Sequence, residues 1–442
     1  MTGQSNASAY PSEAFLLTLL IQRARVLGFP SSHDVPHSRP RKFIMGALPR
    51  RARGGLMRSA LFEASALDRA PSPRPAPARV RAAAGTIAIC GGGTAGHVMT
   101  GLAIAEELRR RDGPEALFLG GRHGLESTLV PGGPCDFLAL PCAPVARERA
   151  AAGLLGALSS VTGALQARRA LRERGAVAAI GVGGYASVPG VLAAWSLGLP
   201  VSIVEVNSHP GLANRALARL ADRVFLGELS DAAGYAPHAV RVTGVPLRQA
   251  FGHLRDRRPV RGPLRVLVTG GSLGSAFLNG AVPELLARVR AAGVELAVTH
   301  QTGPADVLAV RRAYRAADVP ADVCGFLGDF AAELARADFV IGSPGAVTIA
   351  ELAATGVPCL LVPDPRAAAD HQAANAAAFA ARTGCLSCRP ADWDAAQLAD
   401  ALVQRFSDPA RLAGDARRVA GSAAPGAAAR LVDECLRLIE TR

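Results

Sequence analysis

Two short apolar segments, each followed directly by a glycine-rich turn and a helical pattern, constrain this chain more than any other feature. The first is Thr86-Ile-Ala-Ile-Cys90 with the turn Gly91-Gly-Gly-Thr-Ala-Gly96. The second is Arg265-Val-Leu-Val-Thr269 with the turn Gly270-Gly-Ser-Leu-Gly-Ser275. Glycine permits close backbone approach in such turns, and the N–H groups at the start of the following helix favour an anion. We therefore predict two Rossmann-like domains, each opening on a turn suited to phosphate or sugar-phosphate.

The alternation of short apolar strand and helix continues after each turn. This alternation is typical of a parallel sheet with helices on both faces. We predict further strands at 116–119, 177–181, 201–205 and 223–226 in the first domain, and at 295–300, 338–341 and 358–362 in the second. Residues 431–442 have the pattern of an amphipathic helix, with Leu431, Cys435, Leu438 and Ile439 on one side.

The positive charge of the 442-residue chain is concentrated at its start. The formal net charge is +13, but residues 1–84 hold thirteen basic and four acidic residues, a balance of +9 that leaves +4 for the rest. Because this segment is rich in Pro, Ser and Arg without periodicity, we predict a disordered basic tail with at most a short helix near 13–26. Aromatic residues make up only 5% of the chain, which removes the main support for nucleic-acid binding.

The apolar runs and the cysteines indicate the compartment. No run reaches the ~20 residues that a membrane-spanning helix needs. Eight scattered cysteines fit a reducing cytosol, and the close pair Cys385 and Cys388 lacks the second pair of a zinc site, so we predict no metal. The basic amphipathic stretch 154–174 has two open interpretations, a membrane-facing surface or, more commonly, a helix packed on its own sheet.

The two turns lack the fingerprints of the common nucleotide-binding motifs. Neither contains the G-x-x-x-x-G-K-[ST] pattern of ATP-binding loops. The first turn can be aligned with G-x-G-x-x-G, but the acidic residue expected on the second strand is missing at 117–120. Two turns facing one cleft suit a nucleotide-sugar donor in one domain and an acceptor in the other.

Two residues are candidates for chemistry at these turns. His97 stands in the first turn of the first helix, where a neutral imidazole could accept a proton from an acceptor hydroxyl. A histidine that only stabilises its loop is an equally open interpretation. Glu351 follows the strand 338–341 and a Gly-Ser-Pro-Gly turn, where a carboxylate can bind two ribose hydroxyls. An exposed helix carboxylate is the commoner fate of such a residue.

Polar side chains also follow two other predicted strands. Asn207 stands at the carboxyl end of 201–205, where ligands of open α/β sheets gather. His371 and Gln372 begin a helix after 358–362 and could reach sugar hydroxyls, while Asp370 could cap that helix.

Taken together and in order, these motifs closely resemble the MurG family, bacterial enzymes that add N-acetylglucosamine to lipid I. The resemblance covers about four-fifths of the chain, from Thr86 to the end. Eight motifs and Asn207 carry it, the motifs lying at 92–97, 183–189, 210–215, 243–248, 270–274, 300–303, 345–351 and 370–375.

The resemblance implies an α/β GT-B fold with two parallel sheets facing across a cleft. Residues 85–248 would form the acceptor domain on the membrane side, 249–425 would bind the UDP-sugar, and 426–442 would form a helix that crosses back. The implied reaction is an inverting transfer from UDP-N-acetylglucosamine to the C4 hydroxyl of the N-acetylmuramyl unit of lipid I, giving lipid II for peptidoglycan.

The resemblance also implies the surroundings of the enzyme. It places the chain peripherally at the cytoplasmic face of the bacterial cell membrane, without a cofactor or metal. The implied partners are UDP-N-acetylglucosamine, lipid I, an anionic membrane surface and other cell-wall synthesis proteins, with no nucleic acid.

Carried over by position, the resemblance assigns the site. His97 would be the catalytic residue, and whether it is the base itself stays open. The donor sugar and diphosphate would be approached by Thr94, Ala95, Gly96 and Asn207, and the donor site would also include Arg248 and Ser272. The uracil would be held by Leu327 and the ribose by Glu351, and the sugar would contact His371 and Gln372. The diphosphate turn would consist of Ala346, Val347 and Thr348, followed by Ile349 and Ala350.

Four positions depart from the family pattern. Val206, Val245, Leu273 and Ser343 stand where the family usually has Gln, Asn, Gln and Arg, so each removes a polar contact near the donor. Two alternatives are therefore open. The chain could be another GT-B enzyme, such as a glycolipid glycosyltransferase or a UDP-sugar epimerase, or a non-catalytic relative that serves as a cell-wall scaffold.

Overall fold

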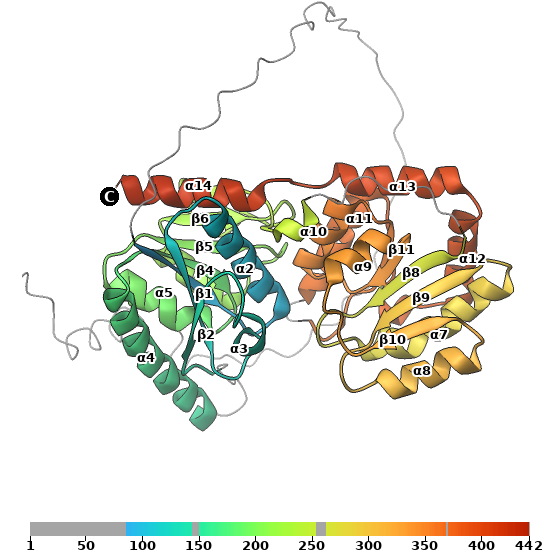
Figure 1. The fold of residues 1–442 in the computed structure, drawn as a ribbon, viewed down its shortest axis with the longest axis horizontal. Coiled ribbons are helices and arrows are strands. Elements are labelled where there is room, and N and C mark those ends of the chain that lie inside the picture. Colours follow the sequence, from blue (N-terminus) through green and yellow to red (C-terminus); the bar gives the residue numbers. More distant parts are fainter. Residues whose placement is uncertain (1–84, 144–149, 253–261, 368–369, 442) are drawn as a thin grey trace, which may run out of the picture. The chain divides into compact units, whose positions relative to one another are not determined.

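The computed structural model describes residues 85–143, 150–252, 262–367 and 370–441 (Figure 1). The predicted tail, with its short helix, lies outside the described residues. Two parallel sheets organise the described chain. The part built around the first sheet, residues 85–242, is called the N-lobe below, and the part built around the second, residues 264–421, is called the C-lobe.

The N-lobe sheet has seven parallel strands in the order β3-β2-β1-β4-β5-β6-β7 among the described residues. Their bounds are β1 Thr86–Gly91, β2 Glu115–Gly121, β3 Asp136–Leu140, β4 Ala176–Gly183, β5 Val201–Glu205, β6 Arg223–Leu226 and β7 Val240–Val242. In the centre of the sheet Ile87 pairs with Ala116 on one side and Ala178 on the other. The five strands predicted for this domain are confirmed.

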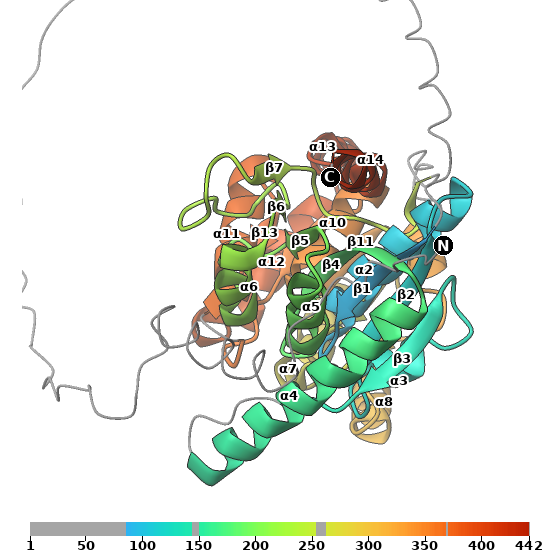
Figure 2. The same ribbon diagram turned by 90° about the vertical axis from the view of Figure 1, so that its left-hand side faces the viewer.

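Helices cover both faces of the N-lobe sheet. Successive strand residues point to opposite sides, and the apolar residues on both sides need a covering layer. Ile87 and Ile89 pack with α2 Ala95–Arg110 and α14 Ala427–Glu440. Ala88 and Cys90 pack on the other face, which α4 Ala150–Glu173, α5 Ser187–Ser196 and α6 Leu212–Leu217 cover (Figure 2). The remaining short helices are α3 Glu126–Leu129, η1 Ala218–Leu220 and η2 Gln249–Phe251, which follows the lobe.

The C-lobe sheet has six parallel strands in the order β10-β9-β8-β11-β12-β13 among the described residues. Their bounds are β8 Leu264–Thr269, β9 Leu296–Gln301, β10 Ala321–Cys324, β11 Phe339–Gly342, β12 Cys359–Leu361 and β13 Leu386–Ser387. The strands predicted for the second domain are confirmed, and each is preceded or followed by a helix.

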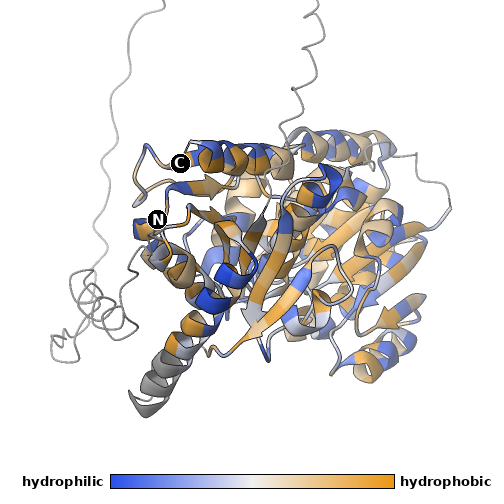
Figure 3. Ribbon diagram, turned by 60° about the vertical axis from the view of Figure 1, so that its left-hand side comes forward, coloured by the Kyte–Doolittle hydropathy of each residue, from blue (hydrophilic) through white to orange (hydrophobic). Residues whose placement is uncertain are grey.

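The C-lobe sheet is also covered on both faces. Val266 and Val268 pack with α7 Ala276–Ala291, α8 Val307–Ala316 and α12 Ala395–Phe406. Leu267 and Val340 point the other way, towards α9 Phe330–Arg336, α10 Ala346–Thr355, α11 His371–Thr383 and α13 Pro409–Gly421. A short helix, η4, spans Pro390–Asp392. Figure 3 shows the consequence, strands in hydrophobic colours and helices with both hydrophobic and hydrophilic residues.

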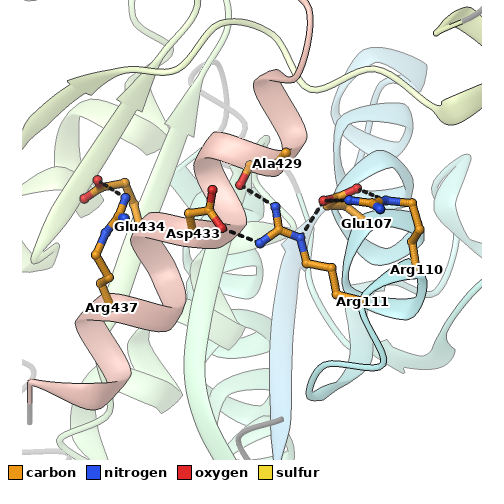
Figure 4. A network of polar contacts seen from close by, with 7 residues as sticks. All are labelled: Glu107, Arg110, Arg111, Ala429, Asp433, Glu434 and Arg437. Carbon is orange, nitrogen blue, oxygen red and sulfur yellow. Dashed lines mark hydrogen bonds and ion pairs between the residues drawn. The ribbon is translucent and has the colours of Figure 1, made fainter. Parts of the chain in front are cut away.

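The last helix, α14, returns to the N-lobe core. Its buried side chains Leu431, Val432 and Cys435 belong to the same apolar cluster as Ile87. At its surface the guanidinium of Arg111, the residue that follows α2, donates to the carboxylates of Glu107 and Asp433 and to the carbonyl of Ala429 (Figure 4). α14 is therefore part of the packing of the N-lobe.

The described part of α4 packs on its own sheet, as the commoner interpretation predicted. Ala167 and Leu171 are buried against the strands, whereas Leu165 is 41% exposed. None of the described helices is long and apolar enough to cross a membrane.

Candidate active site

The first glycine-rich turn holds a conformation that requires glycine. Gly92 and Gly93 have φ angles of +148° and +83°, in a region that favours glycine. A Cβ at Gly92 would lie 2.2 Å from Cδ of Glu126, so the turn also has no room for a side chain there. Thr94 then caps α2 by accepting a hydrogen bond from the N–H of His97 at 3.4 Å. The glycine-rich turn therefore leads directly into α2, whose first three residues are Ala95, Gly96 and His97.

The ring of His97 is fixed by the same turn. Its Nδ1 lies 3.1 Å from the carbonyl oxygen of Gly92 and 3.0 Å from Oγ1 of Thr94. Because a carbonyl can only accept, we assign the proton to Nδ1, which leaves the lone pair on Nε2. Gly183, with a φ of +102°, gives the ring its space, since a Cβ there would lie 2.8 Å from Nε2. Both interpretations of His97 therefore coexist: Nδ1 stabilises the loop, and Nε2 can accept a proton.

Charged groups from both lobes act on His97. Burial lowers the pKa of His97, and the nearby His371 acts in the same direction. The carboxylates of Glu205 and Glu126 and the hydrogen bond to Gly92 oppose this change by raising the pKa. The ring is therefore neutral at pH 7, as a proton acceptor must be.

Glu205, at the end of β5, organises the loop that carries Asn207. It is 2% exposed, and its Oε1 accepts from the backbone N–H of Asn207 at 2.9 Å and from the Asn207 amide at 3.2 Å. Its Oε2 accepts from the N–H of Gly211 and from the amide of Asn214, both at 2.9 Å. Asn207 is among the residues predicted from the sequence and Glu205 is not, although a carboxylate at the end of a buried strand is a usable signal.

The second glycine-rich turn has a similar construction. The hydroxyl of Thr269 accepts from the N–H of Gly271 at 3.1 Å, and the amide of Gln301 donates to the carbonyl of Gly271 at 2.9 Å. Ser272 lies half-buried in this turn, and the side chain of Leu273 is 74% exposed. The predicted turn is thus held by its own strand and by β9.

The first turn of α10 provides an uncapped helix N-terminus. Gly345 precedes the helix and has no side chain to cap it, so the N–H groups of Ala346, Val347 and Thr348 are not bonded by a capping side chain. A Cβ at Gly96 would lie 3.6 Å from Cγ2 of Val347, which shows that the starts of α2 and α10 are in contact. The arrangement can stabilise an anion next to the first turn of α2.

Glu351 is buried, contrary to the exposed alternative. It is 6% exposed, and burial raises its pKa to about 8, with the guanidinium of Arg248 acting in the opposite direction. Cζ of Arg248 lies 5.9 Å from the ring centre of Phe251, and its buried Nε has no hydrogen-bond partner among the residues that the structure describes.

The start of α11 comes from the C-lobe and faces the N-lobe loops. Asp370 stands before the helix with a φ of +51°, but its side chain pairs with Arg389 at 3.2 Å and does not cap the helix. His371 is half-buried and close enough to affect His97. The amide oxygen of Gln372 accepts from the N–H of Asp364 at 2.8 Å, which fixes its side chain.

Not all predicted residues meet at His97. A cavity of about 260 Å³ is lined by Arg248, Ala346, Ile349 and Ala350, together with residues 422–429. Its lining excludes His97, Glu351, His371 and Gln372. Leu327 is half-buried and packs on the C-lobe core beside α9. Ile349 and Ala350 line this cavity together with Ala346, the first residue of α10.

Two of the four departures from the family pattern share one apolar environment. Val206 and Val245 are each 6% exposed and lie in the same buried cluster and along the same cavity. Ser343 is buried, and its hydroxyl has no hydrogen-bond partner within the described part of the chain. Among the described residues, no group of three or more His, Cys, Asp or Glu could hold a metal ion.

Comparisons with known domain families match both lobes. Residues 87–226 match the glycosyltransferase family 28 N-terminal domain, and residues 265–431 match the family 28 C-terminal domain.

Curated relatives agree along almost their whole length. A protein of Pelobacter propionicus is 38% identical over 372 residues, which are 79% of this chain and 98% of the relative. One of Alkalilimnicola ehrlichii is 39% identical over 358 residues, with the same coverage of 79% and 98%. Both are named UDP-N-acetylglucosamine–N-acetylmuramyl-(pentapeptide) pyrophosphoryl-undecaprenol N-acetylglucosamine transferase.

Solved structures show the same fold. The crystal structure of Acinetobacter baumannii MurG is 27% identical, has a TM-score of 0.63, and covers 80% of this chain and 99% of its own. A UDP-N-acetylglucosamine 2-epimerase has a TM-score of 0.59 at 15% identity, with coverage of 82% and 97%, and so shows likeness of fold alone.

Proposed function

The chain belongs to glycosyltransferase family 28, and from this membership we propose that it transfers N-acetylglucosamine from UDP-N-acetylglucosamine to lipid I, giving lipid II. It is a UDP-N-acetylglucosamine-dependent N-acetylglucosaminyltransferase with the GT-B fold. The observation that carries the proposal is the meeting of the histidine turn of α2 with the uncapped N-terminus of α10.

The reaction is a direct displacement. The C4 hydroxyl of the N-acetylmuramyl unit attacks C1 of the donor sugar, a new C–O bond forms, and the bond from C1 to the diphosphate breaks on the opposite face. The hydroxyl proton moves to Nε2 of His97, which is unprotonated because Nδ1 carries the proton towards Gly92. Nε2 is thus the proton acceptor in this proposal.

The leaving diphosphate gains negative charge as the bond breaks. The N–H groups of Ala346, Val347 and Thr348 supply positive dipole at that point, so they stabilise the departing UDP more than the bound donor. Thr94, Ala95, Gly96, Asn207, Ser272, Arg248 and Leu327 complete the proposed donor site, with Glu351 on the ribose and His371 and Gln372 on the sugar.

The domain and membrane assignments are part of the same proposal. The acceptor domain is 85–248, the donor domain 249–425 and the crossing helix 426–442. Lipid I places the enzyme at the cytoplasmic face of an anionic membrane, where other cell-wall synthesis proteins are further partners.

UDP release with a lipid I analogue tests the function. We expect turnover with the wild-type chain and a fall in kcat of ~100-fold or more for His97→Ala, because the proton acceptor is lost. His238→Ala changes an exposed histidine and should leave kcat unchanged. No turnover with lipid I, but UDP formed from another acceptor, would refute the acceptor assignment in favour of another GT-B transferase.

Two further outcomes separate the remaining alternatives. Conversion of the donor to a 2-epimer in the absence of any acceptor would identify an epimerase. Binding of UDP-N-acetylglucosamine without turnover of any acceptor would identify a non-catalytic scaffold.

A further inference from the structure

A fully buried carboxylate lies directly behind the histidine turn. Glu126 is the first residue of α3 and has no exposed surface. Its Oε2 accepts from the N–H of Gly93 at 2.8 Å, and its Oε1 accepts from the N–H of Gly121 at 2.8 Å. Glu126 therefore ties the first glycine-rich turn to the end of β2.

The peptide group that Glu126 holds is the same one that holds His97. The carbonyl of Gly92 and the N–H of Gly93 belong to one planar peptide unit, so they cannot turn independently. Glu126 binds the N–H end of this unit, and Nδ1 of His97 binds the carbonyl end at 3.1 Å. A carboxylate on the N–H also polarises the carbonyl towards the imidazole. The orientation of the ring thus depends on the carboxylate through a single rigid group.

Close packing around the Gly92–Gly93 peptide restricts the conformation of this turn. A Cβ at Gly92 would lie 2.2 Å from Cδ of Glu126, and a Cβ at Gly184 would lie 2.1 Å from the carbonyl oxygen of Gly92. The turn is therefore packed on the carboxylate on one side and on the turn after β4 on the other.

We propose that Glu126 is a positioning residue for the transfer reaction. By fixing the Gly92–Gly93 peptide, it keeps the proton of His97 on Nδ1 and leaves Nε2 free for the acceptor hydroxyl. This proposal rests on the proposed function, because it needs His97 to take part in transfer. Glu126 would orient His97 as a carboxylate orients a histidine to which it is directly hydrogen-bonded, except that one peptide group lies between them.

The position of the proton on His97 tests the proposal without an enzyme assay. In Glu126→Gln the amide has one accepting oxygen, and its NH₂ group faces a backbone N–H, so the peptide loses one of its two anchors. Nitrogen NMR of 15N-histidine-labelled full chain should show the Nδ1–H tautomer of His97 in the wild type and a mixed or Nε2–H tautomer in the variant. An unchanged tautomer would overturn the proposal.

Kinetics give the second readout. We expect Glu126→Gln to lower kcat about tenfold or more and to leave the KM for the donor within about twofold. The charged groups that act on His97 are Glu205 from β5, His371 from α11 and Glu126 itself. Because Glu126 raises the pKa of His97, its loss should also move the acid limb of the kcat profile to lower pH.

A buried carboxylate remote from the site is the matched control. Asp338 is 6% exposed and accepts from the backbone N–H and the guanidinium of Arg265 in the C-lobe. Asp338→Asn should lose stability without a change of tautomer or pH profile. A loss of kcat in Glu126→Gln with no change of pH profile would reduce Glu126 to a structural tie.

A further variant keeps the test decisive if Glu126→Gln does not fold. Glu126→Asp retains the charge but is one methylene too short to reach both N–H groups, so kcat should fall while the acid limb stays in place. Wild-type turnover, measured alongside, reports on the proposed function separately. An active wild type and an equally active aspartate variant would contradict only the positioning role.

Discussion

Asn375 on α11 joins the C-lobe to the N-lobe by accepting a hydrogen bond from the backbone N–H of Ser208 at 2.9 Å. Its amide group donates to the carbonyl of Pro344 at 3.2 Å, just before α10. Asn375 is fully buried, so both ends of its side chain are satisfied away from water. One side chain thus connects the loop after β5, the turn before α10 and the helix of His371.

We expect Asn375→Ala to weaken both the fold and the site. The change leaves a buried N–H and a buried carbonyl unpaired, which should lower the free energy of unfolding by about 1–3 kcal/mol. The loop of Asn207 also loses its link to α11, so kcat/KM for the donor should fall more than stability alone explains. Urea unfolding and initial rates measure the two effects. Gln397→Ala removes an exposed amide on α12 and should change neither.

Glu351 makes stability depend on pH in an unusual direction. Its pKa is about 8 in the folded chain, whereas an unfolded glutamate has a pKa of 4.5. Between these values the folded state holds a proton that the unfolded state has released, so stability falls as pH rises, by about 1.4 kcal/mol per unit. The loss should end above about pH 8, where both states are ionised.

Glu351→Gln should remove this dependence, because a glutamine does not titrate. The difference in unfolding free energy between the variant and the wild type should grow in favour of the variant from pH 5 to pH 8. Taking the difference cancels groups that titrate alike in both chains, including the buried His300, whose pKa burial lowers to about 4. A constant difference across this range would show that Glu351 ionises near its ordinary pKa.

The central strands could be predicted from the sequence, and the edge strands could not. The bounds of β5 and β6 agree with the predicted ranges 201–205 and 223–226, because both strands are short apolar runs. The four strands without a sequence signal, β3, β7, β10 and β13, are the edge strands of the two sheets. An edge strand is only partly covered, so fewer of its residues are buried: β3 has one buried residue among five, and β7 has none.

Site residues could be predicted from the sequence where they lie together in one motif. Contacts that depend on the order of strands in the sheet could not be predicted. Thr94 and His97 belong to one local motif, so both could be selected from the sequence, and the structure places them in contact. Glu126 reaches Gly93 only because β2 is the neighbour of β1, which the sequence does not specify. Asn375 lies in the motif 370–375, but its contact with Ser208 crosses 167 positions.

Burial of α14 should contribute substantially to the stability of the N-lobe. Leu431 is fully buried in the cluster that contains Ile87, so Leu431→Ala should lower the free energy of unfolding by about 2–5 kcal/mol. Arg437→Ala, on the same helix, removes an exposed ion pair with Glu434 and should cost at most about 1 kcal/mol. Equal effects of the two changes in chemical denaturation would show that α14 is only loosely packed.

Leu273 is the departure from the family pattern that a single substitution can test most directly. It lies in the second glycine-rich turn and is 74% exposed, and the resemblance implies a glutamine at this position. Leu273→Gln should restore one hydrogen bond to the donor, worth about 0.5–1.5 kcal/mol, and so lower the donor KM by ~2–10-fold with kcat unchanged. Stability should not change, because the side chain makes little buried contact. Leu308→Gln, at a leucine on α8 that is 66% exposed, is the control and should leave KM as it is. An unchanged KM in Leu273→Gln would mean that the donor does not approach this turn closely enough to bind its side chain.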